Sequence, residues 1–251
     1  MTGARLFLEA ISQVFRNFEA AMRIGLVFAL ILTAVEVYIW GAKNTLTAEE
    51  TQNIEAVFSL ADWLLLLLWM TFFPLIAVAW HRFALLGEPP ISILPRFSFR
   101  LGVGYLGRTV GIMFVSVVPA LMIFVILGDF TDTSNPDDIF DAAVVIAWFV
   151  CGTIMLLFGV LLPAYATERR TKGLFKKARS NLGVIIVISL FSTIAYVGYT
   201  AALETVGVEN LILFTVITGG YHLFGVLIGV SQLTVLYEFL LDAPVNSENT
   251  L

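Results

Sequence analysis

Residues 182–203 of the chain read LGVIIVISLFSTIAYVGYTAAL and contain no charged side chain. The apolar residues follow one another without the alternation of polar and apolar positions that marks a strand of a membrane barrel. No water is available inside the hydrocarbon to satisfy backbone groups, so such a segment must close its own hydrogen bonds as a helix. About 20 apolar residues are enough to cross a bilayer. The stretch therefore predicts a transmembrane α-helix.

The composition of the whole chain predicts the same class. Of the 251 residues, 59% are hydrophobic and 13% are charged, and the mean hydropathy is +0.92. So few polar side chains cannot cover the surface of a soluble protein of this size. The net charge of -5 would suggest an acidic soluble protein on its own, but in a membrane protein the distribution of charge matters more than its sum. The expected fold class is an all-α, polytopic bundle of transmembrane helices.

Six long apolar segments follow one another along the chain. We expect spans at residues 22–42, 58–80, 105–127, 142–167, 182–203 and 211–240. The last is longer than a bilayer core of about 30 Å requires, so we expect it to tilt or to project into water. The expected domains are an amphipathic interfacial helix at residues 1–21, a six-helix transmembrane domain at residues 22–241 and a polar tail at residues 242–251.

Basic residues are confined almost entirely to one set of alternate connections. Lys43 lies in the first connection, and the other thirteen of the fourteen Lys and Arg residues lie in the N-terminal arm or in or next to the second and fourth connections. Acidic residues predominate in the remaining connections. By the positive-inside rule the basic segments, and with them both termini, are cytoplasmic. In the fourth connection we expect contacts with lipid headgroups from Arg169, Arg170, Lys172, Lys176, Lys177 and Arg179.

The segment before the first span has the pattern of an amphipathic helix. Apolar residues recur there at spacings of three and four, and they are Phe7, Ile11, Val14, Phe15, Phe18 and Met22. Thr2 is placed to cap the start of this helix. The sequence leaves two alternatives for the apolar stripe: it lies along the cytoplasmic headgroup boundary, or it packs on the protein's own cytoplasmic face.

One segment carries a resemblance to known proteins. Its residues are Leu162-Pro163-Ala164, Glu168, Ala178, Ser180 and Leu182. The pattern resembles the one that follows a central span in a broad group of uncharacterised six-helix bacterial inner-membrane proteins. That group includes the YciC-like proteins and the membrane domains ahead of some glycerophosphodiester phosphodiesterases. The resemblance implies a bacterial inner-membrane location and no catalytic residue, because the phosphodiesterase domain with its metal site has no counterpart in this chain.

The sequence contains no recognisable catalytic or nucleotide-binding motif. Its only histidines are His81 and His222, too few for a histidine-rich metal site or a paired-histidine hydrolase. It has no Walker loop, no Gly-x-Ser-x-Gly elbow and no His-Glu-x-x-His. The single Cys151 cannot form a disulfide framework or a cysteine metal site. We therefore expect no enzymatic activity, no cofactor and no nucleic-acid partner.

Three ionisable residues inside the expected spans are candidates for a function, because a charge at the bilayer centre costs about 3 kcal/mol. Glu36 and Asp62 are expected in the outer leaflet. They either form a shared polar site or reach the interface and hydroxyls such as Thr33 and Ser59. His222, about 16 Å into the last span, is expected to be the deepest ionisable group. It is either a neutral histidine bonded across a helix interface or a group with a proton or ligand role.

Small residues near His222 predict a packing face. Gly225 and Gly229 form a Gly-x-x-x-Gly pair, which allows two helices to approach closely. These features support three functional hypotheses. The first is a non-enzymatic membrane protein that acts through lateral partners, as an accessory subunit, assembly factor or scaffold, with the lipid bilayer and other membrane proteins or its own copies as partners. The second is a small transporter or channel for an ion or metabolite, and the third is a lipid-modifying enzyme.

Overall fold

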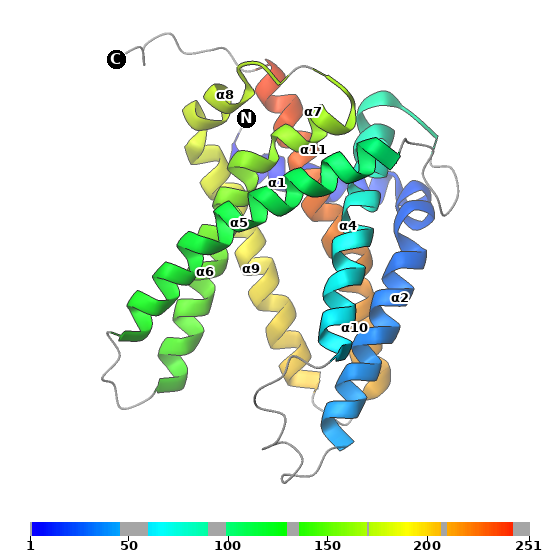
Figure 1. Ribbon diagram of the computed structural model, residues 1–251, viewed down its shortest axis with the longest axis vertical. Coiled ribbons are helices and arrows are strands. Elements are labelled where there is room, and N and C mark those ends of the chain that lie inside the picture. Colours follow the sequence, from blue (N-terminus) through cyan, green and yellow to red (C-terminus); the bar gives the residue numbers. More distant parts are fainter. Residues whose placement is uncertain are drawn as a thin grey trace.

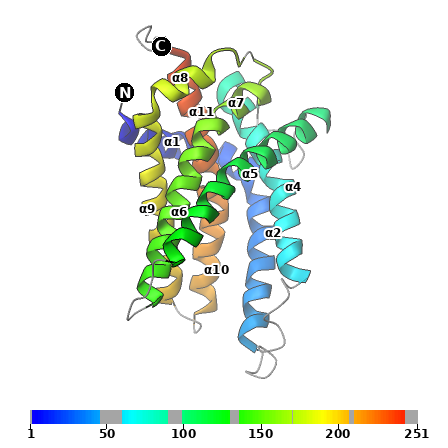
Figure 2. The ribbon, with the colours of Figure 1, turned by 60° about the vertical axis from the view of Figure 1, so that its left-hand side comes forward.

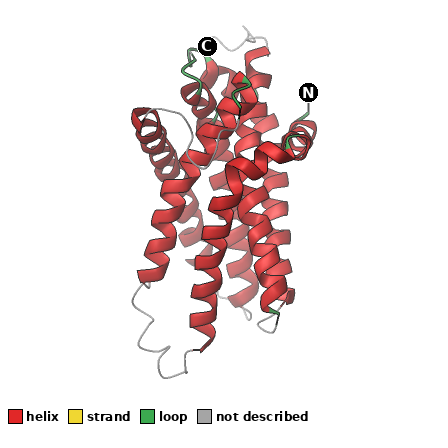
Figure 3. Cartoon of the chain, turned by 90° about the vertical axis from the view of Figure 1, so that its right-hand side faces the viewer, coloured by secondary structure: helices red, strands yellow, loops and turns green. Residues whose placement is uncertain are grey.

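The structure, a computed structural model, describes residues 2–45, 60–89, 99–129, 136–169, 171–206 and 210–242. Their regular structure is entirely helical, with no strand among them (Figures 1 and 3). The elements are α1 (Gly3–Arg16), α2 (Phe18–Thr45), α4 (Leu60–Leu86), α5 (Phe99–Asp129), α6 (Pro136–Gly159), α7 (Leu161–Ala166), α8 (Leu174–Ser180), α9 (Leu182–Val206), α10 (Leu211–Gly220), the π-helical turn η1 (Tyr221–Gly225) and α11 (Val226–Asp242).

Six helical segments are long and apolar enough to cross a membrane, which confirms the number of spans predicted from the sequence. Several helices run past the predicted bounds: α2 continues to Thr45 and α5 already begins at Phe99. A helix satisfies its own backbone groups, so it can continue beyond the apolar segment that hydropathy detects. The sixth segment is not one regular helix, because the turn η1 separates α10 from α11.

The spans form three antiparallel hairpins, in which α2 contacts α4, α5 contacts α6, and α9 contacts α10. Helix α11 lies at the centre, where it contacts α1, α4, α7 and α8. The short helices α7 and α8 lie at one end of the bundle (Figure 2). The end of α11 lies there too, since Lys177 Nζ donates to the carbonyl of Leu241 at 2.9 Å. Because α1 starts against the beginning of α9, both ends of the described chain lie at the end that carries α7 and α8.

Helix α1 packs on the protein's own helices. Its N-cap is Thr2, as predicted, with the Thr2 hydroxyl accepting from the amide of Arg5. Contacts with α9 and α11 bury Leu6, Ala10 and Val14. The buried stripe therefore lies to one side of the predicted one, whose Phe15 and Phe18 stay about half exposed. Small residues cause this shift, because they let the two backbones approach closely. A side chain at Gly3 would come within 2.6 Å of the Val184 carbonyl oxygen.

The α5–α6 hairpin stands at the periphery of the bundle. Helix α5 crosses α4 near the end that carries α7 and then runs away from it (Figures 1 and 2). Only 17% of the spanning segment of α5, and 17% of that of α6, is buried inside the protein, compared with 44% for the span in α2. Large apolar side chains consequently cover most of the surface of α5.

Candidate functional site

The structure brings two of the three predicted polar residues into direct contact. His222 Nε2 lies 2.6 Å from Glu36 Oε2, across the interface between η1 and α2. The histidine side chain is only 3% exposed and the glutamate side chain 29%. The imidazole N–H donates to the carboxylate, so the pair lowers the cost of placing an acid within a span. A hydrogen bond across a helix interface was one of the two alternatives for His222, and Glu36 is the partner that the structure gives it.

Glu36 and His222 lie at comparable distances from the ends of their helices. Nine residues separate Glu36 from the end of this helix at Thr45, and eleven separate His222 from the start of α10. At 1.5 Å per residue these positions lie about 14 and 16 Å from the helix ends. The two side chains are therefore at similar depth. From the sequence, Glu36 was expected in the outer leaflet and His222 deeper in the last span, and the two were not paired.

The surroundings of the pair are aromatic. Trp69 of α4 presents its ring to His222 at an angle of 60°, with 5.6 Å between the ring centroids. Tyr221 stacks on Tyr199 of α9 with centroids 4.0 Å apart. His222 itself belongs to the π-helical turn, an irregularity that often occurs at functional sites. Its second nitrogen, Nδ1, is buried and has no hydrogen-bond partner among the described residues. The pair can thus hold a proton between two groups and has one further nitrogen available.

The other predictions for Glu36 have different outcomes. Thr33 is not its partner, because the Thr33 hydroxyl donates to the Ala29 carbonyl of the same helix at 2.6 Å. The side chain of Asp62 and the whole of Ser59 lie outside the described residues. A polar site shared by Glu36 and Asp62 therefore stays a prediction.

Gly225 and Gly229 do not mediate contact between helices among the described residues. A Cβ atom at Gly229 would meet nothing within 4 Å, and one at Gly225 would meet only Tyr221, on the preceding turn of the same segment. Both glycines line a cavity of about 370 Å³ between α1, α6, α9 and the η1–α11 segment. The close approach near His222 is instead made by Gly25 of α2, where a Cβ would lie 2.8 Å from Leu223. Packing of a second chain against Gly225 and Gly229 stays a prediction.

A second histidine cluster was missed by sequence analysis. His81 is fully buried within the protein, more so than His222. Its Nδ1 lies 2.8 Å from the Thr234 hydroxyl and its Nε2 lies 3.1 Å from the Tyr105 hydroxyl. Thr234 donates its own proton to the Val230 carbonyl. Thr234 must therefore accept from Nδ1–H, and Nε2 must accept from Tyr105. The histidine is neutral, and its two hydrogen bonds connect α4 to α5 and α11.

No local signal in the sequence could have identified this cluster. His81 lies beside Arg82 near the end of a span, a position typical of a side chain that reaches water. Arg82 does behave in that way, since it forms a bidentate pair with Glu88 at 2.8 and 2.5 Å and donates to the Ala166 carbonyl at 3.1 Å.

The basic residues of the fourth connection differ in what they contact. Lys172, Lys176 and Arg179 are exposed, while Lys177 donates to the last turn of α11. Arg169 lines a cleft beside α5 and donates to the Leu85 carbonyl at 3.4 Å. Arg170 lies outside the described residues, as does the predicted tail beyond Asp242. Contact of these groups with lipid headgroups stays a prediction.

Fold and sites together define a helical protein with six helices able to cross a membrane and two histidine-centred clusters among them. Within the described parts of the chain, no three His, Cys, Asp or Glu side chains gather in a way that could hold a metal ion. Comparison with known protein families, curated proteins and solved structures found no match to this chain. The resemblance to bacterial inner-membrane proteins accordingly stays a prediction.

Proposed function

We propose that the chain is a non-enzymatic, multi-pass protein of the bacterial inner membrane that acts through lateral partners, as an accessory subunit, assembly factor or scaffold. The polar side chains described within the spans support this function. They form separate clusters, with Glu36 on His222 and His81 on Tyr105 and Thr234. Neither cluster contains the nucleophile, base and orienting group of a hydrolytic site.

The observation that carries the proposal is the peripheral position of the α5–α6 hairpin. Helix α5 leaves the bundle as it descends from α4 (Figure 1), and exposed apolar side chains continue along it. They are Phe114, Val115, Val117, Val118, Leu121, Met122, Val125 and Ile126. A span with so little intramolecular packing has most of its surface free for a helix of another protein or of a second copy. The partner we propose is therefore a transmembrane helix that packs against α5.

Photocrosslinking from the bilayer-facing surface tests this proposal. A photoreactive residue in place of Met122, which is 60% exposed on α5, should form adducts with a defined membrane protein or with a second copy of the chain. The matched control is Ile212 of α10, which is 79% exposed and should form adducts with lipid alone. If both positions give only lipid adducts in native membranes, the proposed partner surface is wrong.

The orientation is part of the proposal: the end that carries α7 and α8, with both termini, faces the cytoplasm. The exposed Lys172, Lys176 and Arg179 at that end support it by the positive-inside rule. Single cysteines at positions 52, 135 and 208, in a Cys151→Ser background, should react with an impermeant thiol reagent in intact cells. A cysteine at position 172 should react only after lysis. Labelling of position 172 in sealed cells would contradict this orientation.

A small transporter is the second candidate, favoured by the contact between Glu36 and His222 and by the unpaired His222 Nδ1. A carboxylate–imidazole pair within a span is a typical proton-relay element. Flux measurements on purified protein in vesicles distinguish the two candidate functions. If transport is the function, Glu36→Gln and His222→Gln should each abolish a proton or metabolite flux that the wild type shows. If the protein acts through partners, the wild type should show no flux above that of empty vesicles.

A further inference from the structure

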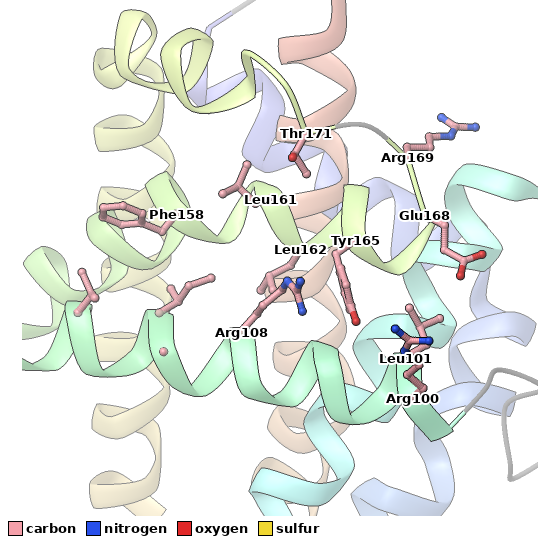
Figure 4. A pocket seen from close by; sticks show the side chains of 13 residues that line it. Arg100, Leu101, Arg108, Phe158, Leu161, Leu162, Tyr165, Glu168, Arg169 and Thr171 are labelled. Atoms are coloured by element: carbon pink, nitrogen blue, oxygen red, sulfur yellow. The ribbon is translucent and has the colours of Figure 1, made fainter.

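A basic cleft of about 890 Å³ lies between α5 and a segment made of the end of α6, helix α7 and the residues that follow it (Figure 4). Its polar lining consists of Arg100, Arg108, Tyr165, Glu168, Arg169 and Thr171. The lining includes three guanidinium groups and one carboxylate, so the cleft attracts anions, although Figure 4 shows the Arg169 guanidinium directed outward at its edge. Its apolar lining consists of Leu101, Ile112, Val115, Phe158, Leu161 and Leu162. The cleft thus combines a charged part with an apolar wall.

Arg108 is held in place for binding. Its guanidinium carbon lies 3.7 Å from the centroid of the Tyr165 ring, and one terminal nitrogen donates to the Gly104 carbonyl at 2.9 Å. The stacking depends on Gly104, because a Cβ atom there would lie 1.9 Å from the Tyr165 hydroxyl oxygen. Most of the five N–H donors of Arg108 have no partner among the described residues. A stacked, planar guanidinium with free donors is suited to bidentate recognition of phosphate.

The other charged groups of the cleft are also incompletely paired. Arg100 makes no hydrogen bond or ion pair within the described residues, and Arg169 makes only its 3.4 Å contact with Leu85. Glu168 has a φ of 56°, in the left-handed region that favours glycine. A non-glycine residue held there often has a functional reason. Figure 4 shows its carboxylate directed toward the start of α5, where it lowers the positive charge of the cleft.

We propose that this cleft binds the phosphate-bearing headgroup of an anionic phospholipid. Arg108 and Arg100 would contact the phosphate, and Arg169 would add positive charge at the edge. The apolar wall favours a lipid over a free phosphate. Through Val115 it continues into the exposed apolar surface of α5 at Phe114 and Val118, along which an acyl chain can lie. The cleft is also at the end of the bundle that carries the exposed lysines of the fourth connection.

Competition binding in detergent tests the site. The probe is fluorescent phosphatidylglycerol bound to the full-length protein, and the competitors are unlabelled phosphatidylglycerol, phosphatidylcholine and inorganic phosphate. Phosphatidylglycerol should displace the probe, while phosphatidylcholine and inorganic phosphate should each need a concentration at least about tenfold higher. Displacement by inorganic phosphate as effective as that by phosphatidylglycerol would overturn the assignment to a lipid.

Matched variants test whether phosphatidylglycerol binds in the cleft. Arg108→Gln should weaken binding of phosphatidylglycerol by about tenfold, as expected for the loss of a charge-assisted hydrogen bond. Arg100→Gln should act in the same direction and breaks no hydrogen bond or ion pair among the described residues, so it serves if Arg108→Gln fails to fold. The control Lys176→Gln changes the net charge equally, but at an exposed position of α8 outside the cleft, and should change affinity less than about twofold.

Glu168→Gln provides a test of opposite sign. The glutamine keeps the size of the side chain and removes the negative charge, so binding of the anionic lipid should strengthen by about threefold, in the range of a surface electrostatic contact. The site would be overturned if Arg108→Gln and Lys176→Gln weakened lipid binding equally. It would also be overturned if neither Glu168→Gln nor Arg100→Gln changed lipid binding.

Discussion

The two histidines of this protein occupy clusters of opposite character. At His81 both ring nitrogens and both hydroxyl partners are used, and the three side chains are buried completely. At His222 one nitrogen is bonded to Glu36 and the other has no partner among the described residues, while the carboxylate remains 29% exposed. A cluster with every polar atom satisfied can only stabilise one arrangement of helices. A cluster with an unpartnered nitrogen and a partly exposed acid retains the capacity to exchange a proton or bind a ligand.

The backbone at each site agrees with this difference. His81 lies within the regular helix α4, whereas His222 lies in the π-helical turn between α10 and α11. The π turn inserts an extra residue per turn and rotates the following side chains relative to a regular helix. Of the two histidines, only His222 thus combines irregular backbone with an incompletely bonded side chain. Of the two histidine clusters, the one at His222 is therefore the candidate for proton transfer.

The largest difference between the clusters should appear in stability. His81→Leu leaves the Tyr105 hydroxyl buried without an acceptor and should lower the free energy of unfolding by about 3 kcal/mol. His222→Leu should cost only about 1 kcal/mol, because it removes a single interhelical hydrogen bond. Thermal or denaturant unfolding in detergent, followed by circular dichroism, measures both values. Equal losses for the two variants would show that the clusters do not differ in the way described.

A smaller effect should report the direct coupling between Glu36 and His222. In a double-mutant cycle with Glu36→Gln and His222→Gln, the coupling free energy should be about 1 kcal/mol, the size of an interhelical hydrogen bond in a membrane protein. The matched control is a cycle with Thr33→Val and His222→Gln, which should show no coupling because Thr33 bonds within its own helix. Coupling as large with Thr33 as with Glu36 would mean that the effect comes from general packing around α2.

The smallest changes in stability should come from substitutions at two glycines near the His222 cluster, Gly25 and Gly229. Gly25→Ala places a methyl group 2.8 Å from Leu223 and should destabilise the protein by up to about 1 kcal/mol. Gly229→Ala meets no atom within 4 Å and should stabilise by about 0.5 kcal/mol, since alanine favours the helix. The same unfolding assay measures both changes. Destabilisation by Gly229→Ala in native membranes but not in detergent would instead favour the packing of Gly229 against a second chain.

Sequence reasoning and structure agree best on the spans. The start of α9 at Leu182 and that of α10 at Leu211 are where the sequence placed them. They disagree on the faces of the helices. The stripe predicted for α1 included Val14, which is buried, and Phe15, which is about half exposed, but it did not include the buried Leu6 and Ala10. The glycines predicted to pack helices together line a cavity, while Gly25, which sequence analysis did not single out, makes the close contact.

This division has a physical reason. Partition of a helix into lipid depends on the summed hydropathy of its own residues, so the sequence by itself determined that the chain is helical and has six segments able to span a membrane. Which side chains meet depends on the depth, rotation and regularity of two helices at once. Glu36 and His222 are 186 positions apart, and their contact depends on how α2 packs against η1. Only the tertiary structure decided that contact, the hydrogen bonds of His81 and the cleft at Arg108.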